Sequence, residues 1–129
     1  MNKKKTIGKL KQDLQKVFNA YIRKRDEGKA CISCGLHKPL QAGHYYAVSG
    51  YDGLRFDEDN VHGECAGCNC FNESHLILYS ENLPNKIGGE RYEELKERAR
   101  DYKRNGYKWS RVEIEEMIIL YRSKLRELE

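Results

Sequence analysis

The chain has 129 residues, of which 39% are hydrophobic and 34% are charged, and its formal net charge is +4. This length predicts a single domain with a modest core, which something besides burial helps to stabilise. The longest apolar run, Met117 to Tyr121, is too short to span a bilayer, and the first residues lack the apolar segment of a signal peptide. We therefore expect a cytoplasmic protein with no membrane partner, in a compartment where disulfides are rare.

Positive charge is concentrated at the start of the chain. Residues 1–38 contain eleven Lys and Arg against three acidic residues, whereas the remainder contains thirteen against seventeen. A basic arm over 1–9, followed by the sequence IRKRDEGK, indicates a surface for nucleic acid, because phosphate contacts release counterions. The alternative is a charged face that is simply solvated. The candidate contacts are Lys3, Lys4, Lys5, Arg23, Lys24 and Arg25.

The first half of the chain predicts one helix and a small irregular β region. Apolar residues recur at helical spacing from Leu10 to Asp26, and Gly28 is a suitable stop, which gives an N-terminal helix within 10–28. Residues 31–69 hold most of the glycines and have no helical period. We expect short strands there, separated by turns.

The second half is predicted to be helical. A helix is expected from Asn69 to about Tyr79, with interruptions at Leu83-Pro84 and at Gly88-Gly89. A charged helix should follow and end before Gly106. The last helix begins at Ser110, which forms a capping box with Glu113 three residues later.

Four of the five cysteines form two C-x-x-C pairs. Cys31 with Cys34 and Cys65 with Cys68 are separated by thirty residues, which lets the chain return and complete a tetrahedron. Four thiolates favour a structural Zn²⁺, since no position is left for water. A redox pair is the alternative. Cys70 is expected to be a packed free thiol that points away from the ion.

Polar residues around the two pairs indicate hydrolysis of phosphodiesters. His44 lies in the expected strand region, Asn60 precedes the second pair, and Asn69 follows it at the expected start of a helix. Imidazole titrates near neutrality, so His44 is a candidate general base for an attacking water. Asn69 offers a hard oxygen suited to Mg²⁺ or Mn²⁺, which would supply Lewis-acid assistance at the phosphate.

This arrangement resembles the HNH or His-Me finger nucleases, including phage endonuclease VII, in which a metal-binding Asn also follows the last zinc cysteine. The stretches CISCG, AGHY, LRFDEDNVHGEC and NLPNKIG are similar to those of the NinG/Rap recombination proteins of lambdoid phages. The resemblance covers about residues 10–125. It implies an α+β fold with a ββα-metal core over 29–80, flanked by the N-terminal helix and a helical part over 81–129.

The resemblance also implies an activity, namely structure-specific cleavage of branched DNA such as Holliday junctions and D-loops. By this resemblance His44 is the general base, Asn69 the catalytic metal ligand and Asn60 the residue that braces the loop. Gly43 stands where many HNH enzymes carry an Asp that also binds the metal. Glu73, one helical turn beyond Asn69, is the candidate replacement, and an ordinary exposed charge is its alternative.

Three further expectations concern recognition and assembly. Arg55 is a candidate phosphate clamp, or else forms a salt bridge to Asp57 or Asp59. His62 either contacts phosphate or makes a structural hydrogen bond. A homodimer built partly from the first or last helix would suit the two scissile strands of a four-way junction.

Two classes of function are compatible with these patterns. The first is a Mg²⁺- or Mn²⁺-dependent DNA endonuclease. The second is a non-catalytic zinc-ribbon protein that binds DNA or RNA, for which the cysteines and the basic arm suffice. Only the endonuclease requires His44 and Asn69 as such.

Overall fold

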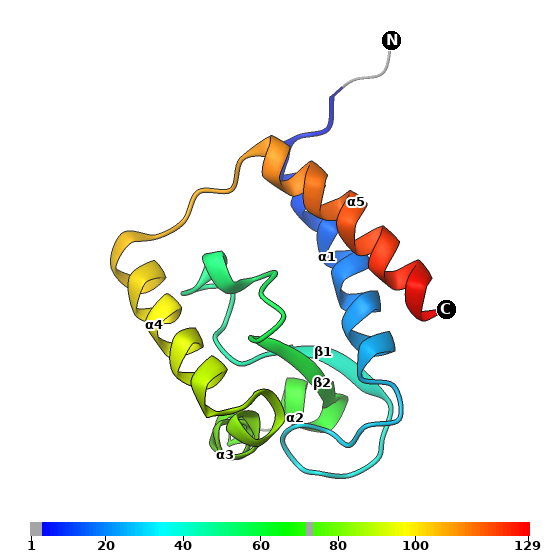
Figure 1. The fold of residues 1–129 in the computed structure, drawn as a ribbon, viewed down its shortest axis with the longest axis vertical. Helices are drawn as coiled ribbons and strands as arrows, with labels where there is room; N and C mark the ends of the chain where they lie inside the picture. Colours follow the sequence, from blue (N-terminus) through cyan, green and yellow to red (C-terminus); the bar gives the residue numbers. More distant parts are fainter. Residues whose placement is uncertain (1–3, 72–73) are drawn as a thin grey trace.

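Two long helices, the first and the last of the chain, pack side by side in the computed structural model, which describes residues 4–71 and 74–129 (Figure 1). Helix α1 spans Ile7–Arg25 and α5 spans Arg111–Leu128. The predicted first helix is confirmed but begins earlier, because Thr6 caps it by accepting a hydrogen bond from the backbone N–H of Lys9. The predicted capping box of α5 is present.

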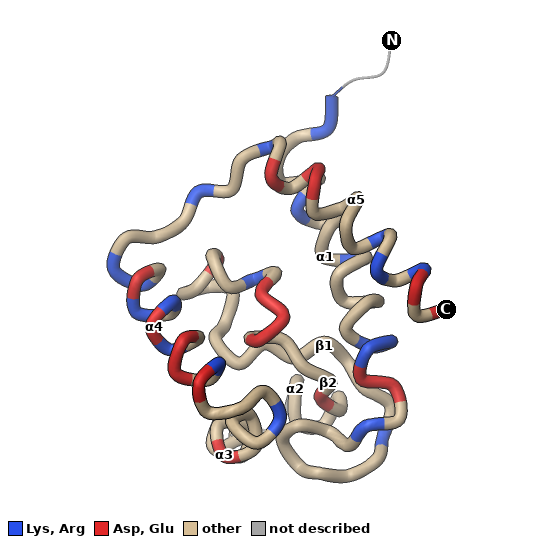
Figure 2. The backbone as a smooth tube through the Cα atoms, viewed as in Figure 1, with Lys and Arg blue, Asp and Glu red and all other residues tan. Residues whose placement is uncertain are grey.

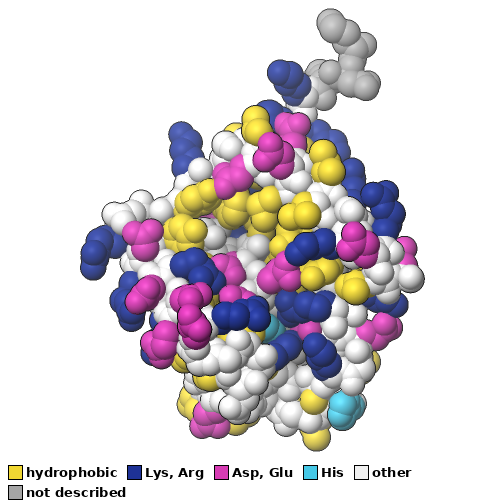
Figure 3. All heavy atoms as spheres, viewed as in Figure 1, with side chains coloured by type: hydrophobic (Ala, Val, Ile, Leu, Met, Phe, Trp, Pro, Cys, Tyr) yellow, Lys and Arg dark blue, Asp and Glu magenta, His cyan; other side chains and the backbone are white. Residues whose placement is uncertain are grey.

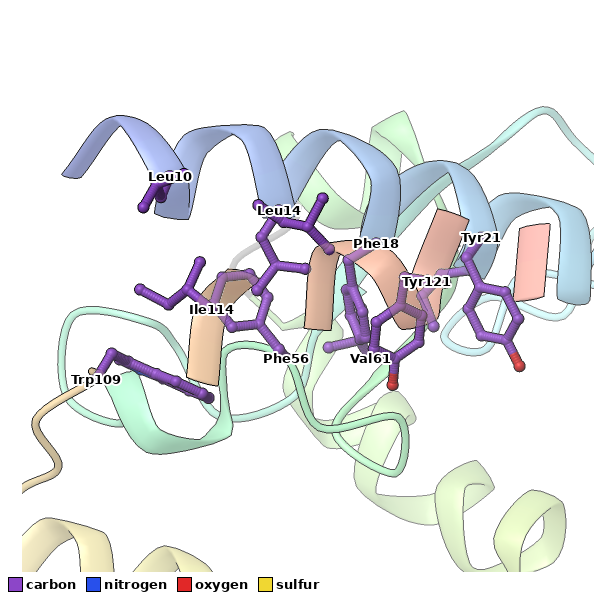
Figure 4. Close-up of a cluster of buried hydrophobic side chains, with 11 residues drawn as sticks. Leu10, Leu14, Phe18, Tyr21, Phe56, Val61, Trp109, Ile114 and Tyr121 are labelled. Atoms are coloured by element: carbon purple, nitrogen blue, oxygen red, sulfur yellow. The ribbon is translucent and has the colours of Figure 1, made fainter. Parts of the chain in front are cut away.

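The facing stripes of α1 and α5 form the first of two hydrophobic clusters (Figure 4). Phe18 is fully buried, and its ring meets the ring of Tyr121 edge to face at 4.8 Å between centroids. Phe56 and Val61, from the middle of the chain, close the cluster from the side of the sheet. The cluster therefore attaches the helix pair to the centre of the molecule.

The centre is one β-hairpin with a long connection. Strand β1 (Leu40–His44) pairs antiparallel with β2 (Val61–Cys65), in a register that sets His44 opposite Val61. The connecting loop, residues 45–60, contains a short 3-10 helix, η1 (Asp52–Leu54). Helix α2 (Ala66–Phe71) follows β2 directly. Among the described residues these two strands form a single sheet, which is less β structure than the turn pattern suggests.

Helices α3 (His75–Ile87) and α4 (Gly89–Asn105) cover the other side of the hairpin. The single helix predicted from Asn69 to about Tyr79 is wrong, since this stretch contains the end of α2 and the start of α3. The predicted interruption at Pro84 is also wrong, since Pro84 lies inside α3. Its missing N–H costs one hydrogen bond, but Tyr79, Leu83 and Ile87 bury one face of α3 in the second cluster. Gly88, at φ 89°, separates the two helices, and Gly106, at φ 68°, ends α4 as expected.

The structure is therefore α+β, as predicted, with α-helices on both sides of a two-stranded sheet. An acidic stretch in the loop before β2 lies between α4 and the helix pair (Figure 2). Within it Asp57 pairs with Arg98, and Asp59 pairs with Arg91, so the stretch ties the loop to α4. No helix in the described part of the chain is long and apolar enough to cross a membrane.

Candidate metal centre and hairpin site

The four cysteines of the two C-x-x-C pairs converge on one point. Cys31 and Cys34 lie in the turn after α1, Cys65 ends β2 and Cys68 lies in α2. Their sulfur atoms all lie within 4.8 Å of one another, and those of Cys34 and Cys65 are 3.8 Å apart. A tetrahedral zinc with bonds of about 2.3 Å requires sulfur atoms about 3.8 Å apart. The predicted cluster is therefore present with a geometry that fits zinc.

Backbone groups around the cluster favour thiolates. The sulfur of Cys31 accepts hydrogen bonds from the backbone N–H groups of Cys34 and Cys65, at 3.4 and 3.3 Å. The backbone N–H of Cys68 lowers the pKa of the Cys65 thiol, whereas burial raises the pKa of the Cys31 and Cys68 thiols in the absence of metal. Since a thiolate is the form that binds metal, the donor set suits a closed four-sulfur site. Cys70 is exposed rather than packed, with its sulfur 3.4 Å from Oε1 of Gln41.

Asn60 holds the long loop of the hairpin. Its fully buried amide accepts a hydrogen bond from the backbone N–H of Tyr46 at 2.8 Å. The same amide donates to the carbonyl oxygens of Tyr46 and Leu54, at 3.1 and 3.2 Å. One side chain thus satisfies three backbone groups of residues 45–60. This loop begins directly after His44.

His44 ends β1 with its imidazole held by the same loop. Its Nε2 lies 3.0 Å from the backbone oxygen of Arg55. A carbonyl only accepts, so Nε2 carries the hydrogen, and Nδ1 has no hydrogen-bond partner among the described residues. Burial lowers the pKa of His44 below its usual value. The result is a neutral imidazole with one nitrogen able to accept a proton.

Asn69 lies on α2 beside the first half of β1. Its Nδ2 donates to Oε1 of Gln41 at 2.9 Å, and its carbonyl oxygen accepts no hydrogen bond from the described residues. Gln41 precedes His44 by three residues, about 10 Å along a strand. His44 and Asn69 thus border the same strand. Glu73, the expected second metal ligand, lies outside the described residues.

A buried acidic residue that the sequence analysis did not single out lies opposite Gln41 in the hairpin. Glu64 of β2 is fully buried, and its carboxylate packs against Gly43. Oε2 accepts from Ser33 Oγ and lies 2.7 Å from Nδ1 of His75. The one available signal was its position directly before Cys65, in a strand whose register was unknown.

Three of the six predicted basic contacts have other partners in the described part of the chain. Arg25 is engaged inside the molecule, where its guanidinium binds the Asp26 carboxylate, the carbonyl oxygen of Val61 and Nδ1 of His62. This internal network corrects the expectation that Arg25 faces nucleic acid. Lys24 pairs with Glu27, while Arg23 lines an open groove beside Lys38. In the basic arm, Lys4 is exposed, Lys5 pairs with Asp13, and Lys3 lies outside the described residues.

His62 and Arg55 also have structural partners. His62 is 2% exposed, and its Nε2 lies 2.8 Å from the backbone oxygen of Asp59. His62 therefore makes a structural hydrogen bond rather than a contact with phosphate. Arg55 donates to Gln15 at 2.6 Å and lies 3.9 Å from Asp52, rather than pairing with Asp57 or Asp59. A phosphate would have to compete with Gln15 for its guanidinium.

A basic groove lies elsewhere, between α4 and the hairpin loop. It measures about 400 Å³, with tyrosines of the loop on one wall and basic residues of α4 on the other. The ammonium of Lys103 lies 5.2 Å from the ring centre of Tyr51. Aromatic rings beside Lys and Arg suit unstacked bases and phosphates. The lining residues are Tyr46, Tyr51, Lys96, Ala99, Arg100, Lys103 and Arg104.

Sequence comparisons place the chain among phage proteins. The family model described as "Bacteriophage Lambda NinG protein" matches residues 1–129. The chain is 36% identical over 116 residues to protein ninG of Escherichia phage 933W and of Salmonella phage P22, with 88% of this chain and 55% of each relative covered. For protein ninG of Escherichia phage lambda the identity is 34%, with 88% and 54% covered. The chain spans about half the length of these relatives, and no solved structure matches it.

Proposed function

Because the chain belongs to the NinG family, we propose that it is a metal-dependent DNA endonuclease that cleaves branched recombination intermediates such as Holliday junctions and D-loops. The observation that carries the proposal is the state of His44. Its imidazole is neutral, oriented by the Arg55 carbonyl, and presents a free Nδ1 beside the strand that Asn69 borders. These are the properties of a general base held in place.

The order of elements supports an assignment to the His-Me finger nucleases. In such a ββα-metal unit, β1 carries the base, β2 returns to the zinc cluster, and α2 carries Asn69 directly after Cys68. The cysteine cluster fixes where α2 begins, because Cys65 and Cys68 stand on either side of the junction between β2 and α2. Asn60 has the bracing contacts that the resemblance implies for the middle Asn.

The residues suggest a division of roles in hydrolysis. Nδ1 of His44 accepts a proton from the attacking water, and burial keeps the ring unprotonated beforehand. The carbonyl oxygen of Asn69 would hold Mg²⁺ or Mn²⁺, which supplies charge stabilisation at the phosphate and the leaving 3′ oxygen. The expected products carry 5′-phosphate and 3′-hydroxyl ends.

The groove along α4 is our candidate DNA surface, together with the exposed Lys4 and Arg23. Arg100→Glu should weaken junction binding by about tenfold and flatten its salt dependence, since phosphate contacts set that slope. Arg122→Glu on α5 makes the same charge change away from the groove and should bind like the wild type. Fluorescence anisotropy at several salt concentrations measures the junction affinity of both variants. Equal losses in both variants would rule out the groove.

We also propose a homodimer that uses α5, since a four-way junction presents two equivalent scissile strands. Hydrophobic side chains gather on one face between α4 and α5 (Figure 3). On α5, Val112, Ile119 and Leu120 are 64%, 68% and 47% exposed. Light scattering should therefore give a dimer that Ile119→Lys converts to a monomer. A monomeric wild-type protein at micromolar concentration would contradict this assembly.

Cleavage of a synthetic four-way junction tests the activity. The zinc-loaded protein should cut with Mg²⁺ or Mn²⁺, and His44→Ala should reduce the rate by at least about 100-fold while junction binding persists. His37→Ala, at an exposed position outside the hairpin, is the matched control and should cut normally. Equal rates for the wild type and His44→Ala would remove the base assigned here.

The alternative is a non-catalytic zinc-binding protein that recognises DNA or RNA, which the cysteine cluster and the α4 groove would serve without any base. Binding of junctions without cleavage under any divalent cation would establish this alternative. In that outcome His44→Ala should leave every measurable property except stability unchanged.

A further inference from the structure

Glu64 is a buried carboxylate with one oxygen left over. The residue is fully buried, with Oε2 accepting from Ser33 Oγ at 2.5 Å and lying 2.7 Å from Nδ1 of His75. Oε1 has no hydrogen-bond partner, and it is the one buried side-chain nitrogen or oxygen of which this is true in the described part of the chain. An unsatisfied buried acceptor is costly, and more so when it carries charge.

The local charges do not neutralise Glu64. Among the described residues its one ion-pair candidate is His75, which is charged only when protonated. Neither Lys nor Arg reaches it there, although Asp26, another buried carboxylate, binds Arg25 and Lys86. Oε1 of Glu64 is therefore a candidate ligand for a further cation.

The carboxylate occupies the place of a side chain at residue 43. Glu64 lies diagonally across the strand pair from Gly43, since Gly43 faces His62 in the register. A Cβ added at Gly43 would come within 2.8 Å of the Cβ of Glu64 and closer still to its Oε1. Residue 43 must therefore be Gly for Glu64 to lie where it does.

Asn69 brings a second oxygen to the same face of the hairpin. Gln41 is the direct cross-strand partner of Glu64, so their side chains share one face of the sheet. Asn69 donates to Gln41 from above that face and keeps its own carbonyl oxygen free of hydrogen bonds from the described residues. Carboxylate and amide oxygens are ligands that Mg²⁺ and Mn²⁺ prefer, with water filling the remaining positions.

We propose that Oε1 of Glu64 and the carbonyl oxygen of Asn69 hold the divalent cation, so that Glu64 supplies the carboxylate absent from position 43. This inference rests on the proposed nuclease function for the identity of the cation. His75 and Ser33 act as positioning residues, because they fix Oε2 and leave Oε1 to the metal. Glu73 is not required.

The first test measures Mn²⁺ binding to the zinc-loaded protein by electron paramagnetic resonance, without DNA. Glu64→Gln keeps the shape and removes the charge, and it should weaken binding at least about tenfold. The matched control is Glu58→Gln, since Glu58 is a partly buried carboxylate whose oxygens already bind Tyr21, Tyr121 and Lys124. That control should bind Mn²⁺ like the wild type. Equal binding by both variants overturns the assignment of Glu64.

The second test moves the carboxylate across the strand pair. Glu64→Ala should lose Mn²⁺ binding. The double variant Gly43→Asp/Glu64→Ala should recover affinity to within a few-fold of the wild type, because removal of the Glu64 carboxylate leaves space for a side chain at position 43. Zinc content and thermal unfolding identify variants that fail to fold. Recovery of Mn²⁺ affinity would support the proposal that a carboxylate at this point of the hairpin binds the cation. A folded double variant that binds no Mn²⁺ would count against it.

A measurement on the unaltered protein covers the case in which the variants misfold. Mn²⁺ broadens nearby amide signals in ¹⁵N-resolved spectra, and the broadening should centre on Gly43, Glu64 and Asn69. Broadening centred elsewhere overturns the proposal. If this site binds Mn²⁺ but no junction is cut, the proposed nuclease function fails while the cation site stands. If Glu64→Gln still cuts junctions, the assignment of Glu64 fails while the nuclease function stands.

Discussion

The helix pair α1–α5 and the hairpin with its cysteine cluster are stabilised by different physical means. Between the helices the contacts are apolar and extensive, with Leu14, Phe18 and Ile114 fully buried. In the hairpin the fully buried residues include Asn60 and Glu64, and four cysteine sulfurs meet within 4.8 Å. An apolar core tolerates changes in its individual side chains, whereas a buried polar centre depends on each hydrogen-bond partner being present.

This difference implies that the hairpin region can be lost while much of the helix pair survives. Among the described residues, Phe56 and Val61 connect the two regions through the first cluster, and polar contacts of Arg25 and Gln15 connect α1 to the hairpin and its loop. The polar region also contains the residues proposed for catalysis. The division therefore separates a region stabilised by apolar burial from a region stabilised by the metal cluster and polar contacts, which also contains the proposed chemistry, and the following predictions test it.

Removal of zinc should have the largest effect. Cys65→Ser or treatment with a strong chelator should unfold residues 31–70, because structural zinc contributes on the order of 10 kcal/mol in small domains. Cys70→Ser is the matched control and should be neutral, since Cys70 lies outside the cluster. Hydrogen exchange resolves the two regions, and uniform loss of protection along the whole chain would contradict the division.

Truncation of a buried side chain in the helix pair should have the second-largest effect on stability. Phe18→Ala removes a buried ring that contacts Phe56 and Tyr121, and it should cost about 3–5 kcal/mol. Glu97→Ala, at an exposed position on α4, should change the free energy of unfolding by less than about 0.5 kcal/mol. Denaturant unfolding of zinc-loaded protein gives both values. A Phe18→Ala variant of wild-type stability would show that the cluster contributes little.

Loss of the loop brace should lower the free energy of unfolding by less than these changes, but it should reduce cleavage more. Asn60→Ala leaves the backbone groups of Tyr46 and Leu54 without their partner, at a cost of about 2–3 kcal/mol. Because the loop also orients His44 through the Arg55 carbonyl, cleavage should fall further than stability accounts for. Asn105→Ala, an exposed amide at the end of α4, is the control. The proposed brace is wrong if both variants behave alike.

The smallest expected effect is a pH dependence from His62. Burial, with the charges of Lys86 and Arg25, lowers its pKa to about 3 in the folded protein. A folded pKa below the unfolded value of about 6.5 means that the unfolded state binds more protons, so stability falls as pH drops from about 6.5 towards 3. Between about pH 7.5 and about pH 5.5 this amounts to about 1 kcal/mol.

Replacement of His62 should remove that slope. We expect His62→Gln to be less stable than the wild type near neutral pH and to lose less stability on acidification, whereas the exposed His37→Gln should follow the wild type. Zinc release at low pH affects all three proteins equally, so the difference between the two variants isolates the imidazole. Parallel pH profiles would exclude His62 as the titrating group.

The sequence predicted the first and last helices and the cysteine cluster well because these have local signals. Apolar spacing marks α1, Ser110 and Glu113 mark the start of α5, and paired C-x-x-C motifs mark the zinc donors. Pro84 gave a wrong prediction because the cost of a proline inside a helix is outweighed here by burial of α3 residues against distant partners. The extent of each element therefore depended on contacts that no local pattern contains.

The polar residues of the hairpin were the least predictable. The register that places Glu64 against Gly43 is set by the pairing of two distant strands, and a shift of one residue would reverse every side chain. Arg25 illustrates the same limit, since its place in a basic run suggested nucleic acid while its partners Val61 and His62 lie far along the chain. The groove on α4 likewise requires the loop tyrosines.

The contact between Phe18 and Tyr121 joins residues near opposite ends of the chain. During synthesis α1 leaves the ribosome long before α5 exists, so its apolar stripe is exposed to chaperones and to other nascent chains until α5 has been made. Early structure around the metal would shorten the search by holding β2, and with it Val61, next to α1. Zinc supply in the host cell would then govern how quickly newly made copies escape aggregation.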